Sequence, residues 1–113
     1  MKNIKFYLTL SLIGVFFRVN GQKSNTEAKF KVWGNCGMCE KTIEKSLKVK
    51  GVELADWDKN TKIIAVKYDS TKITLIQIHE KIAAVGYDTE LKKGNDKAYN
   101  NLHSCCQYNR KEN

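Results

Sequence analysis

The order in which strand-like and helix-like segments follow one another between residues 27 and 92 constrains this chain more than any other feature. Apolar residues that alternate with polar ones predict strands at 28–32, 52–58 and 62–69, and a short strand at 87–91. Apolar residues three or four positions apart predict two helices, one from about 39 to 49 and one capped by Ser70 or Thr71 and ended by Gly86. The predicted order is therefore β-α-β-β-α-β.

This order predicts an α+β fold of the ferredoxin-like type, in which two helices cover one face of a four-stranded antiparallel sheet. The strands at 52–58 and 62–69 are joined by a short turn and form a hairpin, and Gly51 is the expected C-cap of the first helix. The 113 residues suffice for one domain, and a hydrophobic fraction of 42% predicts a folded core. We place this domain at residues 27–92.

The N-terminal segment reads as a targeting signal rather than as part of the domain. Residues 1–21 resemble a secretion signal, because Lys2 and Lys5 precede an apolar run at 6–17 that is too short for a comfortable membrane span. Small residues suited to cleavage follow the run. We expect cleavage and a periplasmic or secreted protein, with membrane anchoring through residues 6–17 as the alternative.

Outside the signal and the domain, residues 22–26 predict a flexible leader and residues 93–113 a C-terminal tail. The formal net charge is +8, and the lysines are interleaved with Glu and Asp, which is a solubilising pattern rather than a nucleic-acid-binding stripe. We expect a monomer that binds no nucleic acid. Lys41 and Lys45 lie on the exposed side of the first helix, where they either solvate the surface or meet an acidic partner.

Cys36 and Cys39, separated by Gly37 and Met38, lie in the predicted loop between the first strand and the first helix. The two thiols are close enough to hold one ion, and the first helical turn favours a thiolate at Cys39. Two thiolates suit a soft ion of low coordination number: copper(I) fits best, and mercury(II) or silver(I) fit chemically. Zinc(II) prefers four ligands, so the pair alone is a poor structural zinc site. We identify Cys36 and Cys39 as the main metal ligands.

Residues 27–92 resemble the heavy-metal-associated domain, the module of copper chaperones, of metal-pumping ATPases and of the periplasmic mercury-binding protein. The family carries Gly-Met-x-Cys-x-x-Cys between its first strand and first helix, and Cys36 and Cys39 match its two ligands. Gly86 and Tyr87 match the loop that faces the metal. The resemblance implies a metallochaperone or metal scavenger that is not an enzyme. It would pass its ion by ligand exchange to a metal-transporting ATPase or another Cys-containing metal-binding domain.

The sequence departs from the family just before the first ligand. The family's Met, two residues before it, is Gly34 here, and its Gly is Trp33. Because that Met normally supports the loop from the core, the departure predicts a softer or differently packed loop, which Gly34 and Gly37 would let bend around an ion. Trp57 is expected in the core or at the sheet edge, whereas Trp33 either shields the loop or faces a partner. His79 is expected on the surface of the second helix.

The predicted tail contains a second group of possible ligands, namely His103, Cys105 and Cys106. If the tail folds back, these residues could join Cys36 and Cys39 as auxiliary ligands and widen the choice of ion towards zinc(II) or cadmium(II). Otherwise the adjacent cysteines form a disulfide with another cysteine, or an exposed thiol pair that docks to a partner.

Two other functions remain open for the Cys-x-x-Cys pair. A periplasmic thiol-disulfide redox protein uses the same motif, but a thioredoxin-like enzyme needs a longer fold and usually a cis-proline, and this chain has no proline. A protein-interaction module with this fold would instead carry a permanent Cys36–Cys39 disulfide. Because an oxidised pair cannot bind metal, oxidation and metal binding compete.

Overall fold

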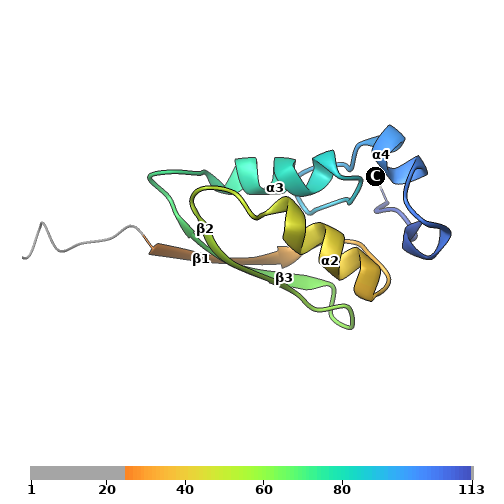
Figure 1. The fold of residues 1–113 in the computed structure, drawn as a ribbon, viewed down its shortest axis with the longest axis horizontal. Helices are drawn as coiled ribbons and strands as arrows, with labels where there is room; N and C mark the ends of the chain where they lie inside the picture. Colours follow the sequence, from red (N-terminus) through yellow and green to blue (C-terminus); the bar gives the residue numbers. More distant parts are fainter. Residues whose placement is uncertain (1–24, 113) are drawn as a thin grey trace, which may run out of the picture.

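The computed structural model describes residues 25–112, which form a three-stranded antiparallel sheet with two longer helices (Figure 1). The strands are β1 (Asn25–Lys31), β2 (Val52–Trp57) and β3 (Ile63–Asp69), and the longer helices are α2 (Gly37–Ser46) and α3 (Leu75–Ala84). A short helix, α4 (Asp96–Asn100), and a 3-10 turn, η1 (Ser104–Cys106), follow. The predicted signal at 1–21 lies outside the described residues. Within 25–112, no helix combines the length and apolarity needed to cross a bilayer.

The sheet has the order β1-β3-β2, with β3 in the middle. Phe30 of β1 pairs with Ile64 of β3, and Trp57 of β2 pairs with the same Ile64 from the other side. All three side chains are buried, because alternate residues of a strand point to the same face of a sheet. The predicted hairpin of β2 and β3 is confirmed.

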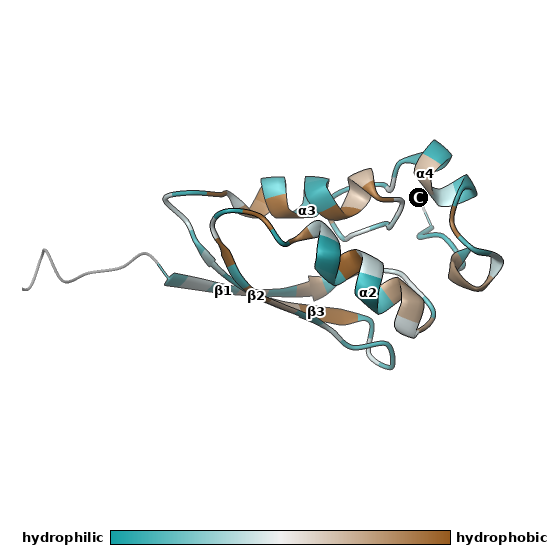
Figure 2. Cartoon of the chain, in the orientation of Figure 1, coloured by the Kyte–Doolittle hydropathy of each residue, from teal (hydrophilic) through white to brown (hydrophobic). Residues whose placement is uncertain are grey.

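Both longer helices cover one face of this sheet (Figure 1). Ile43 and Leu47 of the α2 region and Ile78 and Ile82 of α3 are fully buried, at the spacing that places them on one side of a helix. Hydrophobic and hydrophilic stretches of ribbon are interspersed along both helices (Figure 2). Burying each such side chain contributes about 1.5–3 kcal/mol, so the predicted α+β layers are confirmed and their core is apolar.

The ends of the helices differ in detail from the sequence prediction. Thr74, not Ser70 or Thr71, caps α3, because its hydroxyl accepts a hydrogen bond from the Gln77 backbone N–H while the Gln77 side chain accepts one from the Thr74 N–H. Gly86 follows α3 with φ 103°, a left-handed conformation suited to glycine, as predicted. Gly51 also has a positive φ, 99°, but it belongs to the turn into β2, since α2 already ends at Ser46.

The predicted fourth strand at 87–91 is wrong for the described residues. The segment makes one isolated bridge, Val32 to Thr89, and no ladder. The reason lies in its own polar side chains: the Thr89 hydroxyl accepts the Lys92 backbone N–H at 3.0 Å, and an Asp88 carboxylate oxygen accepts the Gly94 N–H at 2.7 Å. The segment stays beside the end of β1 through two backbone hydrogen bonds, Trp33 N–H to the Asp88 carbonyl and Glu90 N–H to the Lys31 carbonyl. The local side-chain bonds keep it from continuing as a ladder, since Asp and Thr compete with ladder formation in this way.

The prediction that His79 is a surface residue is also wrong, because its side chain is 1% exposed. Its ring stacks on Phe30 with ring centroids 3.8 Å apart, and its Nδ1 lies 2.7 Å from the Thr89 hydroxyl. His79 follows Ile78 directly and precedes Ile82 by three residues, so it shares the buried stripe of α3. The helical spacing already placed position 79 on the buried side of α3, but the polarity of histidine led to the wrong prediction.

Residues 93–112 fold against the domain rather than extending from it (Figure 1). Tyr108 is buried and stacks on Tyr87 with centroids 5.5 Å apart, while Tyr99 packs edge-on against Tyr108 at 5.1 Å. Gly94 lies so close to Gly86 that a Cβ on Gly94 would come within 2.8 Å of the Gly86 backbone. We call residues 93–112 the C-terminal segment.

Candidate metal centre

The start of α2 positions the two predicted ligands. Cys36 is the N-cap residue, with extended backbone angles, and its carbonyl accepts the Glu40 N–H at 3.1 Å as the first helical hydrogen bond. Cys39 lies in the first turn, is fully buried, and its sulfur accepts the Asn35 N–H at 3.4 Å. The two sulfurs are 3.7 Å apart. Both predicted main ligands therefore point to one place, at the positive end of a helix.

The backbone around this helix end favours a charged Cys36. Hydrogen bonding from the Cys39 N–H, helped by the Met38 N–H, lowers the pKa of the Cys36 thiol from 9.0 to about 7, against a smaller opposing effect of desolvation. A thiol with this pKa is substantially ionised at neutral pH, and the thiolate is the form that binds metal. The helix end thus supplies a ready ligand.

Trp57 supports the loop from below and accounts for the unusual Gly34. Its indole N–H donates to the Val32 carbonyl at 3.0 Å, and its ring edge lies 3.0 Å from the point where a Cβ on Gly34 would be. A side chain at position 34 would press on this ring, which would have to shift by a few tenths of an ångström. The core position of Trp57 is confirmed, and this tryptophan from β2 lies beneath the loop at Gly34.

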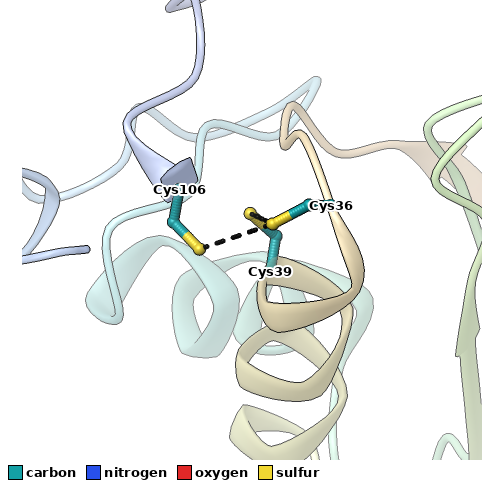
Figure 3. A group of neighbouring side chains, drawn as sticks. All are labelled: Cys36, Cys39 and Cys106. Atoms are coloured by element: carbon teal, nitrogen blue, oxygen red, sulfur yellow. Dashed lines mark hydrogen bonds between the residues drawn. The ribbon is translucent and has the colours of Figure 1, made fainter. Parts of the chain in front are cut away.

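The C-terminal segment brings a third sulfur to the pair (Figure 3). Cys106 lies in η1, is 3% exposed, and its sulfur is 3.9 Å from that of Cys36. The sulfur atoms of Cys36, Cys39 and Cys106 all lie within 4.8 Å of one another. Of the two adjacent tail cysteines, the fold thus brings Cys106 to the predicted site.

The other two predicted auxiliary ligands lie outside this cluster. The Cys105 side chain is exposed and its sulfur lies 3.8 Å from the Met38 sulfur, whereas its carbonyl accepts the Asn35 side-chain N–H at 3.2 Å. His103 is exposed and is absent from the group of potential ligands found within residues 25–112. All four cysteines are free thiols in the structure. Of the alternatives predicted for the tail, the structure therefore shows the one in which it folds back. It brings one of its three candidate ligands, Cys106, to the pair.

Tyr87 completes the surroundings of the three sulfurs. Its ring is fully buried, and its hydroxyl has no hydrogen-bond partner in the described part of the chain. Burial raises the pKa of this hydroxyl, and the neighbouring sulfurs of Cys39 and Cys106 contribute to the shift. The hydroxyl therefore keeps its proton, which leaves a buried donor beside two sulfurs. Such a donor is costly to leave unpaired.

A polar anchor, which the sequence analysis missed, holds the C-terminal segment in place. Asp88 is 1% exposed, and its carboxylate accepts two hydrogen bonds from the Arg110 guanidinium at 2.9 and 2.7 Å. It also accepts the backbone N–H groups of Gly94 and Lys111, at 2.7 and 2.9 Å. Burial alone would raise the pKa of Asp88, but these hydrogen bonds together outweigh it and lower the pKa.

Tyr108 connects this anchor to the loop that follows α3. Its hydroxyl donates to the Gly86 carbonyl at 2.7 Å and accepts the Asp88 N–H at 2.8 Å. The loop residues 86–88 therefore contact the segment on both sides of Tyr87. One signal in the sequence pointed here: Arg110 is the sole arginine after Arg18 in a lysine-rich chain, and arginine is favoured where a carboxylate is bound by two parallel hydrogen bonds.

Known proteins share this fold. The chain is 31% identical to a putative copper-ion-binding protein from Bacillus anthracis, with a TM-score of 0.58 over 61% of this chain and 100% of the other. It is 28% identical to the N-terminal domain of a potential copper-translocating P-type ATPase from Bacillus subtilis, solved in the Cu(I)-loaded state (TM-score 0.56; 64% and 92% covered). It is 26% identical to oxidised MerP from Ralstonia metallidurans (TM-score 0.55; 58% and 94% covered). A comparison of this chain with curated proteins found no match.

Paired thiols at the first helix of this α+β fold are the arrangement of a small heavy-metal-binding domain. The family model of the heavy-metal-associated domain matches residues 35–88, and this chain belongs to that family. The resemblance predicted from the sequence is confirmed, and membership supports binding of a heavy-metal ion. The match ends before residue 93, so Cys106 and its anchor Arg110 lie beyond it.

Proposed function

We propose that this protein captures a soft metal ion, copper(I) in the first place, between Cys36 and Cys39 and passes it to a partner. The observation that carries the proposal is the pair of sulfurs 3.7 Å apart at the N-terminus of α2. Backbone N–H groups at this helix end lower the pKa of Cys36 to about 7. Ionised sulfur in a largely buried position binds polarisable ions in preference to hard ones.

Copper(I) is favoured over other ions by the donor set. The cluster contains cysteine sulfur and no carboxylate or imidazole, which suits copper(I), silver(I) and mercury(II). Zinc(II) usually takes four protein ligands in a structural site, and the cluster supplies fewer. The similarity to a copper-loaded ATPase domain supports copper, whereas the similarity to MerP keeps mercury(II) as the alternative.

The ion would leave by ligand exchange rather than by catalysis. A thiolate of the partner binds the ion while one bond to Cys36 or Cys39 breaks, so no bond within a substrate changes and the protein is not an enzyme. A metal-transporting ATPase or another Cys-containing metal-binding domain suits this exchange. Lys41 and Lys45 are exposed on α2 beside the loop and would attract an acidic partner surface.

We place this function in the periplasm or outside the cell, because residues 1–21 have the pattern of a secretion signal. In an oxidising compartment the same pair can close into a disulfide and lose the ion. Native mass spectrometry with and without reductant separates the two states. In this measurement a metal carrier gains the mass of one ion when it is reduced, whereas an interaction module keeps its disulfide. A redox enzyme is recognised by a separate assay, because it would reduce insulin.

The direct test is an anaerobic titration of the reduced protein with copper(I) against a competing chromogenic chelator. One tightly bound ion is expected, and it should be lost in the double variant Cys36→Ser, Cys39→Ser. Cys105→Ser is the matched control, since Cys105 is exposed and outside the cluster. Tight binding that survives in the double variant would refute the proposal.

A further inference from the structure

We propose that Cys106 supplies a third thiolate to the ion held by Cys36 and Cys39, so that the domain and its C-terminal segment share one trigonal sulfur site. This inference rests on the proposed function, because it takes binding by Cys36 and Cys39 as given. The ligand class is a soft ion that accepts three thiolates, such as mercury(II) or copper(I).

The spacing of the sulfurs fits three ligands better than two. With a metal–thiolate bond of about 2.3 Å, two sulfurs on opposite sides of an ion are about 4.6 Å apart, and three in a plane are about 4.0 Å apart. The sulfur of Cys36 lies 3.7 Å from that of Cys39 and 3.9 Å from that of Cys106. Both distances are close to the trigonal value and well short of the linear one.

Cys106 is held at the site by contacts that do not involve an ion. Two residues further on, Tyr108 is fixed by hydrogen bonds to the Gly86 carbonyl and the Asp88 N–H. Four residues further on, Arg110 is bound by the buried Asp88 carboxylate. Because both anchors bind the loop that follows α3, the third sulfur is positioned in advance, which lowers the ordering cost of closing the site.

The buried Tyr87 hydroxyl is a second, independent observation that points to a charged occupant. It is fully buried, and the sulfurs of Cys39 and Cys106 lie close enough to be weak acceptors, but it makes no well-formed hydrogen bond in the described part of the chain. A metal-bound thiolate is a better acceptor than a thiol. Loading the site would give this donor a partner, since S–metal bonds replace the S–H bonds of those cysteines that are still protonated, and their protons are released to solvent.

The two adjacent tail cysteines give the proposal its control. Cys105 and Cys106 share the same backbone segment, yet Cys105 is exposed, whereas Cys106 is 3% exposed within the sulfur cluster. A variant of either residue removes one thiol from the same place in the sequence. A difference between the variants therefore reports position at the ion rather than thiol number.

The test is X-ray absorption spectroscopy at the mercury edge. The reduced protein is separated from all other thiols and is then loaded with one equivalent of mercury(II) chloride. The parent protein and Cys105→Ser should show three sulfur ligands, and Cys106→Ser should show two with shorter bonds. In a competition with a dithiol chelator, Cys106→Ser should release mercury about tenfold faster or more, since even the loss of supporting residues around a metal weakens binding 10–100-fold.

The outcomes separate this inference from the function on which it rests. Two sulfurs in all three proteins, or three in Cys106→Ser, would overturn the third ligand and leave the proposed function standing. Failure of all three proteins to bind mercury(II) would overturn both. Far-ultraviolet circular dichroism checks that Cys106→Ser is folded, and Cys106→Ala, which keeps a small apolar residue in the buried position, must give the same sulfur count of two.

Discussion

The domain at residues 25–92 and the C-terminal segment at 93–112 both reach the sulfur cluster, but the segment depends on a polar clamp, the hydrogen bonds between Arg110 and Asp88, as well as on apolar packing. The domain is closed by apolar side chains from a sheet and two helices. The segment has one short helix and one 3-10 turn, and it is attached by Tyr108 and by the hydrogen bonds that converge on Asp88. Cys36 and Cys39 thus come from the domain, whereas Cys106 is buried in the same cluster as Cys39 but comes from a segment that the Asp88 hydrogen bonds also hold. The two parts of the site should therefore respond to different perturbations.

The largest expected effect comes from the domain side. Trp57→Ala removes a fully buried ring that also supports Gly34, and it should lower the free energy of unfolding by about 3–5 kcal/mol. Urea unfolding followed by circular dichroism measures this. Leu54→Ala on the same strand, where the side chain is half exposed, should cost less than about 1 kcal/mol. Equal losses in the two variants would contradict the view that Trp57 is a core support.

A smaller effect is expected from the clamp. Arg110→Ala leaves the Asp88 carboxylate buried without its guanidinium partner and should destabilise the docked segment by about 2 kcal/mol. Hydrogen exchange measured by mass spectrometry should rise across residues 96–108 and stay unchanged in α3. The control is Lys93→Ala, which breaks an exposed 3.6 Å ion pair with Asp96 worth less than about 1 kcal/mol. Unchanged exchange in the segment of Arg110→Ala would argue against the clamp.

A change confined to a helix end should leave the segment untouched. Thr74→Ala removes the N-cap of α3 and should cost about 1 kcal/mol of stability. Ser70→Ala, at the cap position suggested by the sequence, should cost clearly less. Chemical denaturation compares the two, and a larger loss for Ser70→Ala would contradict the capping box.

The smallest effect is a pH dependence that differs between the two regions. Burial lowers the pKa of His79 below 6.5, with Lys111 adding to the shift and Glu90 opposing it. The unfolded chain therefore takes up this proton first. The contribution to stability is complete above pH 6.5 and falls at lower pH, by less than about 1.4 kcal/mol per pH unit. In His79→Phe, which keeps an aromatic ring stacked on Phe30, the free energy of unfolding should not show this decrease between pH 6.5 and 5.5.

Asp88 should respond in a separate, more acidic range. Its pKa lies below the ordinary 3.8 because the hydrogen bonds from Arg110, Lys111 and Gly94 outweigh burial. Its contribution is therefore complete above about pH 4 and is lost as the pH falls through the lowered pKa. Hydrogen exchange at pH 5.5 should find the segment still docked although the domain is already weakened. Release of the segment at pH 5.5 would show that something other than the Asp88 carboxylate holds it.

The sequence predicted the domain better than the segment for a physical reason. The spacing of Ile78 and Ile82 and the alternation of Ile64 and Val66 are local patterns, and both predicted faces are buried. The fourth strand failed because Asp88 and Thr89 use their side chains on nearby backbone groups, and a local polarity pattern does not show which competing hydrogen bond forms.

The site divides in the same way. Cys36 and Cys39 could be predicted because their spacing at a helix start is itself the signal. Cys106 could not be distinguished from Cys105 or His103, since the choice depends on how a segment without periodicity is attached. That attachment joins Asp88 to Arg110, which are 22 positions apart. Pairings of this kind become visible once the chain is folded.

The close approach of Gly86 and Gly94 has a consequence for how sequence variation in this protein should be read. A single added methyl group at Gly94 would press on the backbone of Gly86 and Tyr87. The two chain segments would have to move apart where they cross. A variant there would contain every cysteine and every charge, yet, if the proposed function is right, we expect it to hold its ion less tightly. A comparison of the ligand residues alone would therefore miss the effect of such a variant.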